Sequence, residues 1–122
     1  MRRLVAILLL AAACGGKKAD GVSGAVEAWK KAGLEASAFS KVEGGDLGGA
    51  CQVGVVGGLD VTLCEYADAS AAKASEEKGL AIVGDATGAS LASGKLLLVV
   101  ADRRKADPSG KKLNQLTQTF RQ

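Results

Sequence analysis

Two short apolar runs lie on either side of Gly57-Gly58. They are residues 51–56 (CQVGVV) and residues 59–64 (LDVTLC), and short runs of this composition bounded by turn residues are typical of β-strands. Two consecutive glycines between such runs indicate a two-residue primed turn. Pairing about that turn places Cys51 directly opposite Cys64. The pattern therefore predicts an antiparallel hairpin with the two cysteines on neighbouring strands.

A second hairpin is predicted around Ser93-Gly94. Its return strand, residues 95–102 (KLLLVVAD), carries apolar side chains at odd and even positions, as strands buried on both faces do. If helices cover only one face of the sheet, the other face exposes apolar surface, which marks binding sites in soluble proteins. Coverage of that face by the third helix or by residues 35–50 is the alternative.

The first predicted helix covers residues 23–32. Ser23 is the expected N-cap, and Trp29 belongs to its apolar face. Gly33 is the expected C′ glycine, since glycine adopts the left-handed conformation of a helix end without strain. In a Schellman ending, Leu34 packs back on Trp29.

Two further helices are predicted. Asp68 caps a helix over residues 69–78 that ends at Gly79-Leu80. Asp107 and Pro108 open the last helix as its N-cap and first helical residue. The apolar stripe of this helix consists of Leu113, Leu116 and Phe120.

Together these elements predict a single α+β domain over residues 22–122, in the order α-ββα-ββα. Each hairpin is followed by an acidic cap and a helix, which suggests a pseudo-repeat of about 36 residues. The expected architecture is an antiparallel sheet of four to six strands with about three helices packed against it. Residues 36–42 are a candidate strand, and residues 44–49 are a candidate loop.

Composition removes several classes of function. The 122 residues include no histidine, which removes the commonest general base, the usual transition-metal ligand and Ser-His or Cys-His catalysis. Two of the 16 basic side chains precede residue 14, which leaves 14 basic against 13 acidic side chains and a net charge of about +1. This balance does not indicate a nucleic-acid partner. We expect no metal site, no catalytic residue and no enzymatic activity.

Residues 1–13 have the layout of an export signal. Arg2 and Arg3 precede an apolar run of about ten residues, which is too short to span a bilayer as a helix. The stretch LAAAC at residues 10–14 resembles the lipobox of bacterial lipoproteins. That resemblance implies cleavage before Cys14, with diacylglycerol and acyl lipid on Cys14 as the only covalent additions and no other cofactor. Residues 14–21 then form a lipidated N-terminus and a flexible tether.

Two details of this segment keep alternatives open. The lipoprotein family prefers Leu three positions before the cysteine, whereas this chain has Ala11 there and Leu10 one position further back. Ala11-Ala12-Ala13 also fits ordinary signal peptidase, which would leave a soluble secreted protein with a free thiol at Cys14. Gly15 follows Cys14, and the absence of Asp there resembles outer-membrane lipoproteins, which face the periplasm or the cell surface.

The number of cysteines agrees with lipidation. Three cysteines in an exported chain leave one unpaired. The hairpin register puts Cys51 and Cys64 in a non-hydrogen-bonded site, where the Cα atoms are about 4.5 Å apart, and this spacing suits a disulfide. An oxidising envelope favours that bond. Cys14 is the cysteine that remains for lipid.

Three other groups of residues are candidates for chemistry. A basic cluster is a candidate contact patch for lipid headgroups, anionic glycans or an acidic protein, with a solvated turn as the alternative; it consists of Arg103, Arg104, Lys105, Lys111 and Lys112. Acidic residues near the first hairpin and the second helix suit acid–base work or calcium only if they converge; they are Asp60, Glu65, Asp68 and Asp85. The glycines at 44–49 lack the Lys and Ser/Thr of a phosphate loop.

The functional expectation is a membrane-anchored cell-envelope lipoprotein, acting as a non-enzymatic interaction or scaffold module with an envelope protein as its partner. An inhibitor of a secreted enzyme is an alternative, because tandem α/β repeats with a disulfide resemble β-lactamase-inhibitory proteins at the level of architecture. A carrier of a small apolar ligand is the other alternative.

Overall fold

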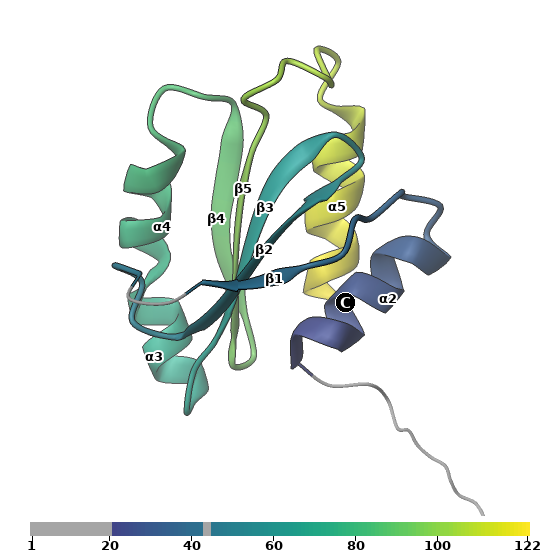
Figure 1. Ribbon diagram of the computed structural model, residues 1–122. Helices are drawn as coiled ribbons and strands as arrows, with labels where there is room; N and C mark the ends of the chain where they lie inside the picture. The colour runs from purple at the N-terminus through teal and green to yellow at the C-terminus, as the bar shows by residue number, and fades with distance from the viewer. Residues whose placement is uncertain (1–20, 43–44) are drawn as a thin grey trace, which may run out of the picture.

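The computed structural model describes residues 21–42 and 45–122. The predicted signal, Cys14 and the tether before Gly21 lie outside the described residues. The described chain is an α+β domain built on one antiparallel sheet of five strands in the order β1-β2-β3-β5-β4 (Figure 1). The elements are α2 (Gly21–Lys31), β1 (Ser40–Val42), β2 (Ala50–Val56), β3 (Leu59–Glu65), α3 (Ala69–Ala74), α4 (Glu76–Val83), β4 (Gly88–Ser93), β5 (Leu96–Ala101) and α5 (Lys111–Arg121).

The first predicted hairpin is confirmed in its register. Val56 pairs with Leu59, and Cys51 pairs with Cys64. Gly57 and Gly58 have φ angles of 59° and 85°, which is the pattern of a type I′ turn. The two cysteines form a disulfide with a Cα–Cα distance of 3.9 Å. Turn chemistry in the sequence was therefore sufficient to place the sulfur atoms of these residues together.

The end of α2 is also confirmed. Gly33 has a φ of 92°, its N–H donates to the carbonyl of Lys30, and the N–H of Leu34 donates to the carbonyl of Trp29, as in a Schellman motif. Trp29 is fully buried, and its Nε1 donates to the carbonyl of Leu116 at 2.9 Å. The predicted start is wrong, because α2 begins at Gly21 and Ser23 lies inside it.

The second helix differs most from its prediction. Asp68 is the N-cap and accepts a hydrogen bond from Ala71 N, but the helix breaks at Ser75 and continues as α4 to Val83. Gly79 does not end it. A Cβ on Gly79 would strike Ser90 Oγ and would lie 2.7 Å from Val99 Cγ2. Gly79 is therefore the point where α4 touches the sheet, and local sequence carries no sign of that contact.

The second hairpin turns one residue later than predicted. Ser93 pairs with Leu96, so Gly94 and Lys95 form the two-residue loop and β5 begins at Leu96 rather than Lys95. Gly94 has a φ of 58°, which suits the first position of a type II′ turn. The predicted two-sided burial of this strand is confirmed, because five of its six residues are buried.

Helices cover the sheet on both faces, but not evenly. On one face, α2 and α5 pack against the even-numbered residues of β5, with Leu98 and Val100 in the same core as Trp29 and Leu116. On the other face, Val83 of α4 packs with the odd-numbered residues of β5. The element order therefore suggests a repeat, but the helices that follow the two hairpins lie on opposite faces, and the pseudo-repeat has no symmetric counterpart in space.

The last helix begins three residues after its predicted start. α5 starts at Lys111 after Gly110, whose φ is 76°. Asp107 still satisfies the helix end, because its Oδ2 accepts the N–H of Leu113 at 2.9 Å. The predicted apolar stripe is confirmed in its packing: Leu116 and Phe120 are buried, and Leu113 is partly buried against the same core.

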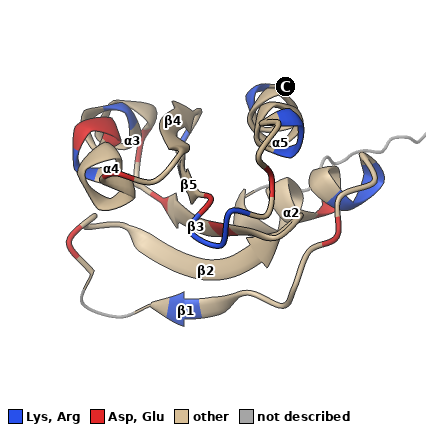
Figure 2. Cartoon of the chain, turned by 90° about the horizontal axis from the view of Figure 1, so that it is seen from above, with Lys and Arg blue, Asp and Glu red and all other residues tan. Residues whose placement is uncertain are grey.

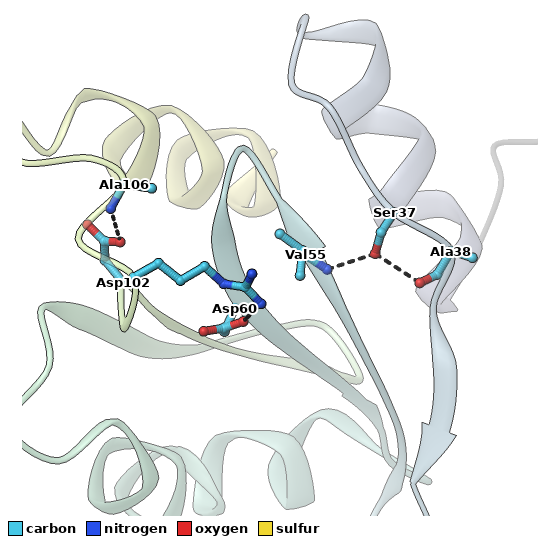
Figure 3. Close-up of polar contacts among 7 residues, drawn as sticks. Ser37, Ala38, Val55, Asp60, Asp102 and Ala106 are labelled. Atoms are coloured by element: carbon cyan, nitrogen blue, oxygen red, sulfur yellow. Dashed lines mark hydrogen bonds and ion pairs between the residues drawn. The ribbon is translucent and has the colours of Figure 1, made fainter.

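Residues 36–42 form a shorter strand than predicted. Only Ser40–Val42 make up β1, and Ala36 adds an isolated bridge to Val56. Between these two points, Ser37 N donates to the carbonyl of Val55, and Val55 N donates to Ser37 Oγ at 2.9 Å. The side chain of Ser37 thus replaces a missing backbone partner along β2, as the dashed lines in Figure 3 show.

Candidate functional site

The predicted basic cluster begins in the loop between β5 and α5. Arg103 Nη2 donates to the carbonyl of Ile82 near the end of α4 at 2.7 Å. Arg104 Nη2 lies 3.0 Å from Asp60 Oδ1 on β3 (Figure 3). The two arginines therefore extend from one loop to different elements. We call Arg103, Arg104 and Lys105 the basic rim.

A buried carboxylate holds this loop in shape. Asp102 is only 8% exposed, and its Oδ1 and Oδ2 accept the backbone N–H groups of Ala106 and Asp107 at 2.8 and 3.0 Å. Lys105, which lies between Asp102 and Ala106, has a φ of 55°, the one positive value among non-glycine residues that the structure describes. Such backbone strain persists only where surrounding bonds enforce it. The conformation of the basic rim is thus set by Asp102.

The two remaining members of the predicted cluster lie apart from the basic rim. Lys111 and Lys112 are exposed in the first turn of α5. The stem of Lys112 lies beside the turn of the first hairpin, since a Cβ on Gly57 would be 3.4 Å from its Cδ. Figure 2 shows the blue loop of the basic rim beside β3, with α5 beyond it. The five residues of the predicted cluster therefore extend from the loop between β5 and α5 to the first turn of α5.

An open hollow of about 810 Å³ adjoins the basic rim. Its lining includes Asp102 and Asp107 together with Arg103 and Lys105. The two carboxylates are occupied by backbone N–H groups and, for Asp107, by Ser109 Oγ at 3.3 Å. These acids are structural, so the hollow does not present a free pair of carboxylates for acid–base chemistry.

The other surface of interest is the part of the sheet that α3 and α4 leave uncovered. The register aligns side chains of β1, β2 and β3 on the face opposite α2 and α5. We call this surface the open sheet face; it consists of Ser40, Val42, Val53, Val55, Asp60 and Thr62. Val42 and Val53 are 37% and 39% exposed, although both stand on strands.

The disulfide closes one end of the open sheet face. Cys51 and Cys64 occupy the next cross-strand row, and Leu47 packs over them in the same small core. The carbonyl of Leu47 accepts the hydroxyl of Tyr66 at 2.7 Å, and the ring of Tyr66 lies where Gly49 has no Cβ. The described part of the glycine-rich loop therefore covers the disulfide, which agrees with its prediction as a loop and with a structural role.

The C-terminal half of α4 borders the open sheet face on its other side. Glu76 marks the outer flank of α4, because its carboxylate accepts Ala92 N at the free edge of β4. Six residues later, at 100° per residue, Ile82 is rotated by about 120° from Glu76, so the two residues flank Gly79, which touches the sheet. Ile82 is 42% exposed, and the basic rim reaches its carbonyl through Arg103. Apolar surface and basic charge thus meet at this border.

The predicted acidic residues do not converge. Asp60 pairs with Arg104, Asp68 caps α3, and Glu65 lies at the other end of β3 from Asp60. Within the described residues no three His, Cys, Asp or Glu side chains gather in a way that could hold a metal ion. Asp68 thus serves as a cap and Asp60 as a member of an ion pair, whereas Asp85 lines the hollow beside the basic rim.

The apolar surface that residues 95–102 would expose if helices covered only one face of the sheet is not found there, and the alternative of a covered face holds, with α3 and α4 as the cover rather than residues 35–50. Both faces of β5 are covered, one by α2 and α5 and the other by α3 and α4. The uncovered surface belongs to β1, β2 and β3 instead. The sequence signal for it was weak: Val53 and Val55 alternate with Gln52 and Gly54, and nothing local distinguishes a valine under a helix from an exposed one.

No described helix combines the length and apolar character needed to cross a bilayer. No family model, no curated protein and no solved structure matches the chain.

Proposed function

We propose that this protein is a small lipid-anchored protein of the bacterial cell envelope whose domain serves as a non-enzymatic interaction module. The disulfide between Cys51 and Cys64 carries the proposal furthest, because disulfides persist in oxidising compartments and the chain begins with the layout of an export signal. Pairing of these two cysteines leaves Cys14 as the third, at the position where a lipoprotein signal would end.

The described domain has features of a docking module rather than of an active site. Its buried carboxylates, Asp102 and Asp107, are bonded to backbone N–H groups, and the chain offers no histidine as a general base. Its open sheet face, in contrast, exposes valines on a rigid, stapled support. Exposed apolar side chains on a rigid sheet are the kind of surface that partner proteins bind.

The two alternatives have unequal support. An apolar ligand carrier needs an enclosed apolar cavity, whereas the largest hollow described above is open and lined partly by charged side chains. An inhibitor of a secreted enzyme would also bind through a surface, so it falls within the proposed class and differs only in the identity of the partner.

The anchor is tested by mass spectrometry of the mature N-terminus together with metabolic palmitate labelling. The expected result is a chain that begins at Cys14, carries diacylglycerol and acyl lipid, and sediments with membranes. Cys14→Ser should abolish labelling and release the protein, while Cys51→Ser should leave labelling intact. A mature N-terminus with an unmodified Cys14 thiol would refute the lipoprotein proposal.

A further inference from the structure

We propose that the open sheet face, together with the basic rim, docks an acidic protein partner. This rests on the proposed interaction module and names its surface and the chemistry of its partner. The other face of the sheet and its two edges are covered or protected by residues of the described chain.

The two edges of the sheet are poor sites for a further strand. At the β4 edge, Glu76 Oε2 accepts Ala92 N at 2.7 Å, so a carboxylate already occupies this backbone position. At the β1 edge, all three residues of the strand pair with β2, and the central residue is Lys41. A strand of three residues with a central lysine is a protected edge. Binding at the sheet is therefore expected at the face rather than by strand addition.

The open sheet face combines an apolar centre with a charged border. Val53 is exposed on β2, Val42 is exposed at the end of the edge strand β1 opposite Cys51, and Ile82 is exposed on α4. The basic rim adds three consecutive cations at the same border, because Arg104 reaches Asp60 of the open sheet face and Arg103 reaches the carbonyl of Ile82. An apolar core within a polar border is the usual anatomy of a protein interface.

The positive charges of the basic rim indicate that the partner has a negatively charged surface. Of the acids nearest the basic rim, Asp60 is already paired, and Asp102 is buried with both oxygens bonded to backbone N–H groups. Asp85 is exposed and lines the hollow beside Arg103 and Lys105, so it offsets one of the three positive charges. The side chain of Arg104 is 59% exposed in its ion pair, and Arg103 and Lys105 are exposed as well. Their remaining N–H groups face solvent, where carboxylates of a partner would pair with them.

The position of the basic rim argues against the anchoring membrane as its ligand. A Cβ on Gly21, where the described chain begins, would lie 2.9 Å from Glu65 Oε1 at one end of β3, whereas the basic rim contacts Asp60 at the other end. Five residue steps along β3 separate Asp60 from Glu65 by about 17 Å. An anchor at Cys14 would attach at the Gly21 end, so the basic rim lies at the end of the domain far from the point of attachment.

The test replaces Val53 by a photoreactive p-benzoylphenylalanine in the full chain, produced in its own cells. A matched control places the same residue at Glu77, an exposed position on α4 about 160° around the helix from Gly79, which touches the sheet. The proposal expects one protein adduct from position 53, absent from position 77, whose identified partner has an acidic surface. The charge-reversal pair Arg103→Glu and Lys105→Glu should lower the adduct on the order of tenfold, while Lys73→Glu on α3 should leave it unchanged.

Four results would overturn the proposal: an adduct with a second copy of the chain, an adduct with lipid or glycan only, a protein adduct that is indifferent to charge reversal, or equal adducts from both positions. A partner captured from Glu77 but not from Val53 would overturn the docking surface and leave the interaction module standing. Absence of any adduct from either position, in cells where Cys14 carries lipid, would count against both. Unchanged near-UV circular dichroism of each variant establishes that it is folded.

Discussion

The substitution Gly79→Ala tests whether Gly79 is only a residue of α4 or also the point where α4 packs on the sheet. The two roles predict opposite changes in the free energy of unfolding. If Gly79 were only an exposed helical residue, alanine would stabilise α4 by about 1 kcal/mol. The structure predicts the opposite, because the added methyl group would strike Ser90 Oγ and approach Val99 Cγ2 to 2.7 Å. Overpacking of this kind costs about 1–3 kcal/mol.

A hydrogen bond adds to that cost. Ser90 Oγ donates to the carbonyl of Glu76 at 2.7 Å, and displacing the hydroxyl forfeits a further 0.5–1.5 kcal/mol, roughly. After subtracting the gain in helix propensity, Gly79→Ala should lower the free energy of unfolding by about 0.5–3.5 kcal/mol. For a domain of this size, 1 kcal/mol corresponds to a fall in Tm of roughly 4–8 °C.

Urea unfolding of the oxidised chain is the assay, with fluorescence of the single, fully buried Trp29 as the probe. Ala81→Gly, at an exposed position of the same helix, is the matched control for propensity and should cost about 1 kcal/mol. The double variant Gly79→Ala, Ser90→Gly should recover part of the loss, since it removes the hydroxyl and Cβ that obstruct the new methyl group. A Gly79→Ala protein more stable than wild type would refute the contact between α4 and the sheet.

Three further perturbations test other parts of the structure. Replacing Cys51 and Cys64 together by alanine should lower the free energy of unfolding by about 3 kcal/mol at most, because the bridge has a sequence separation of 13. The urea midpoint, with and without reductant, measures this loss. An unchanged midpoint would contradict a stabilising bridge. Asp107→Ala should cost about 1 kcal/mol through the lost bond to Leu113 N, read from the shift in Tm, whereas Asp107→Asn should cost less. Arg104→Ala should change stability by no more than about 1 kcal/mol, because its ion pair is exposed, and a larger loss in the thermal melt would mean that the loop depends on this pair.

Local sequence was sufficient where one or two residues dictate the backbone. Gly57-Gly58 determined the hairpin register, and the register determined the disulfide. Gly33 determined the end of α2. These features depend on interactions among near neighbours in the chain, for which turn and cap chemistry are adequate guides.

Local sequence was insufficient where a residue is explained by a distant partner. Gly79 has the same appearance as Gly33 in the sequence, each followed by Leu, yet one ends a helix and the other admits a strand against it. Asp107 caps α5 across an intervening turn rather than from the adjacent position.

The location of the open sheet face also depends on residues that are distant in the chain. The chain by itself determined an α+β composition of elements, a stapled hairpin and an acidic-capped helix, because those follow from local backbone preferences and hydrophobic patterning. Only the tertiary structure decided which strands the helices cover, since both faces of β5 and the exposed valines of β1 and β2 present similar apolar sequences. The open sheet face exists because α3 and α4 lie over β4 and β5, and that placement depends on packing between residues far apart in the chain.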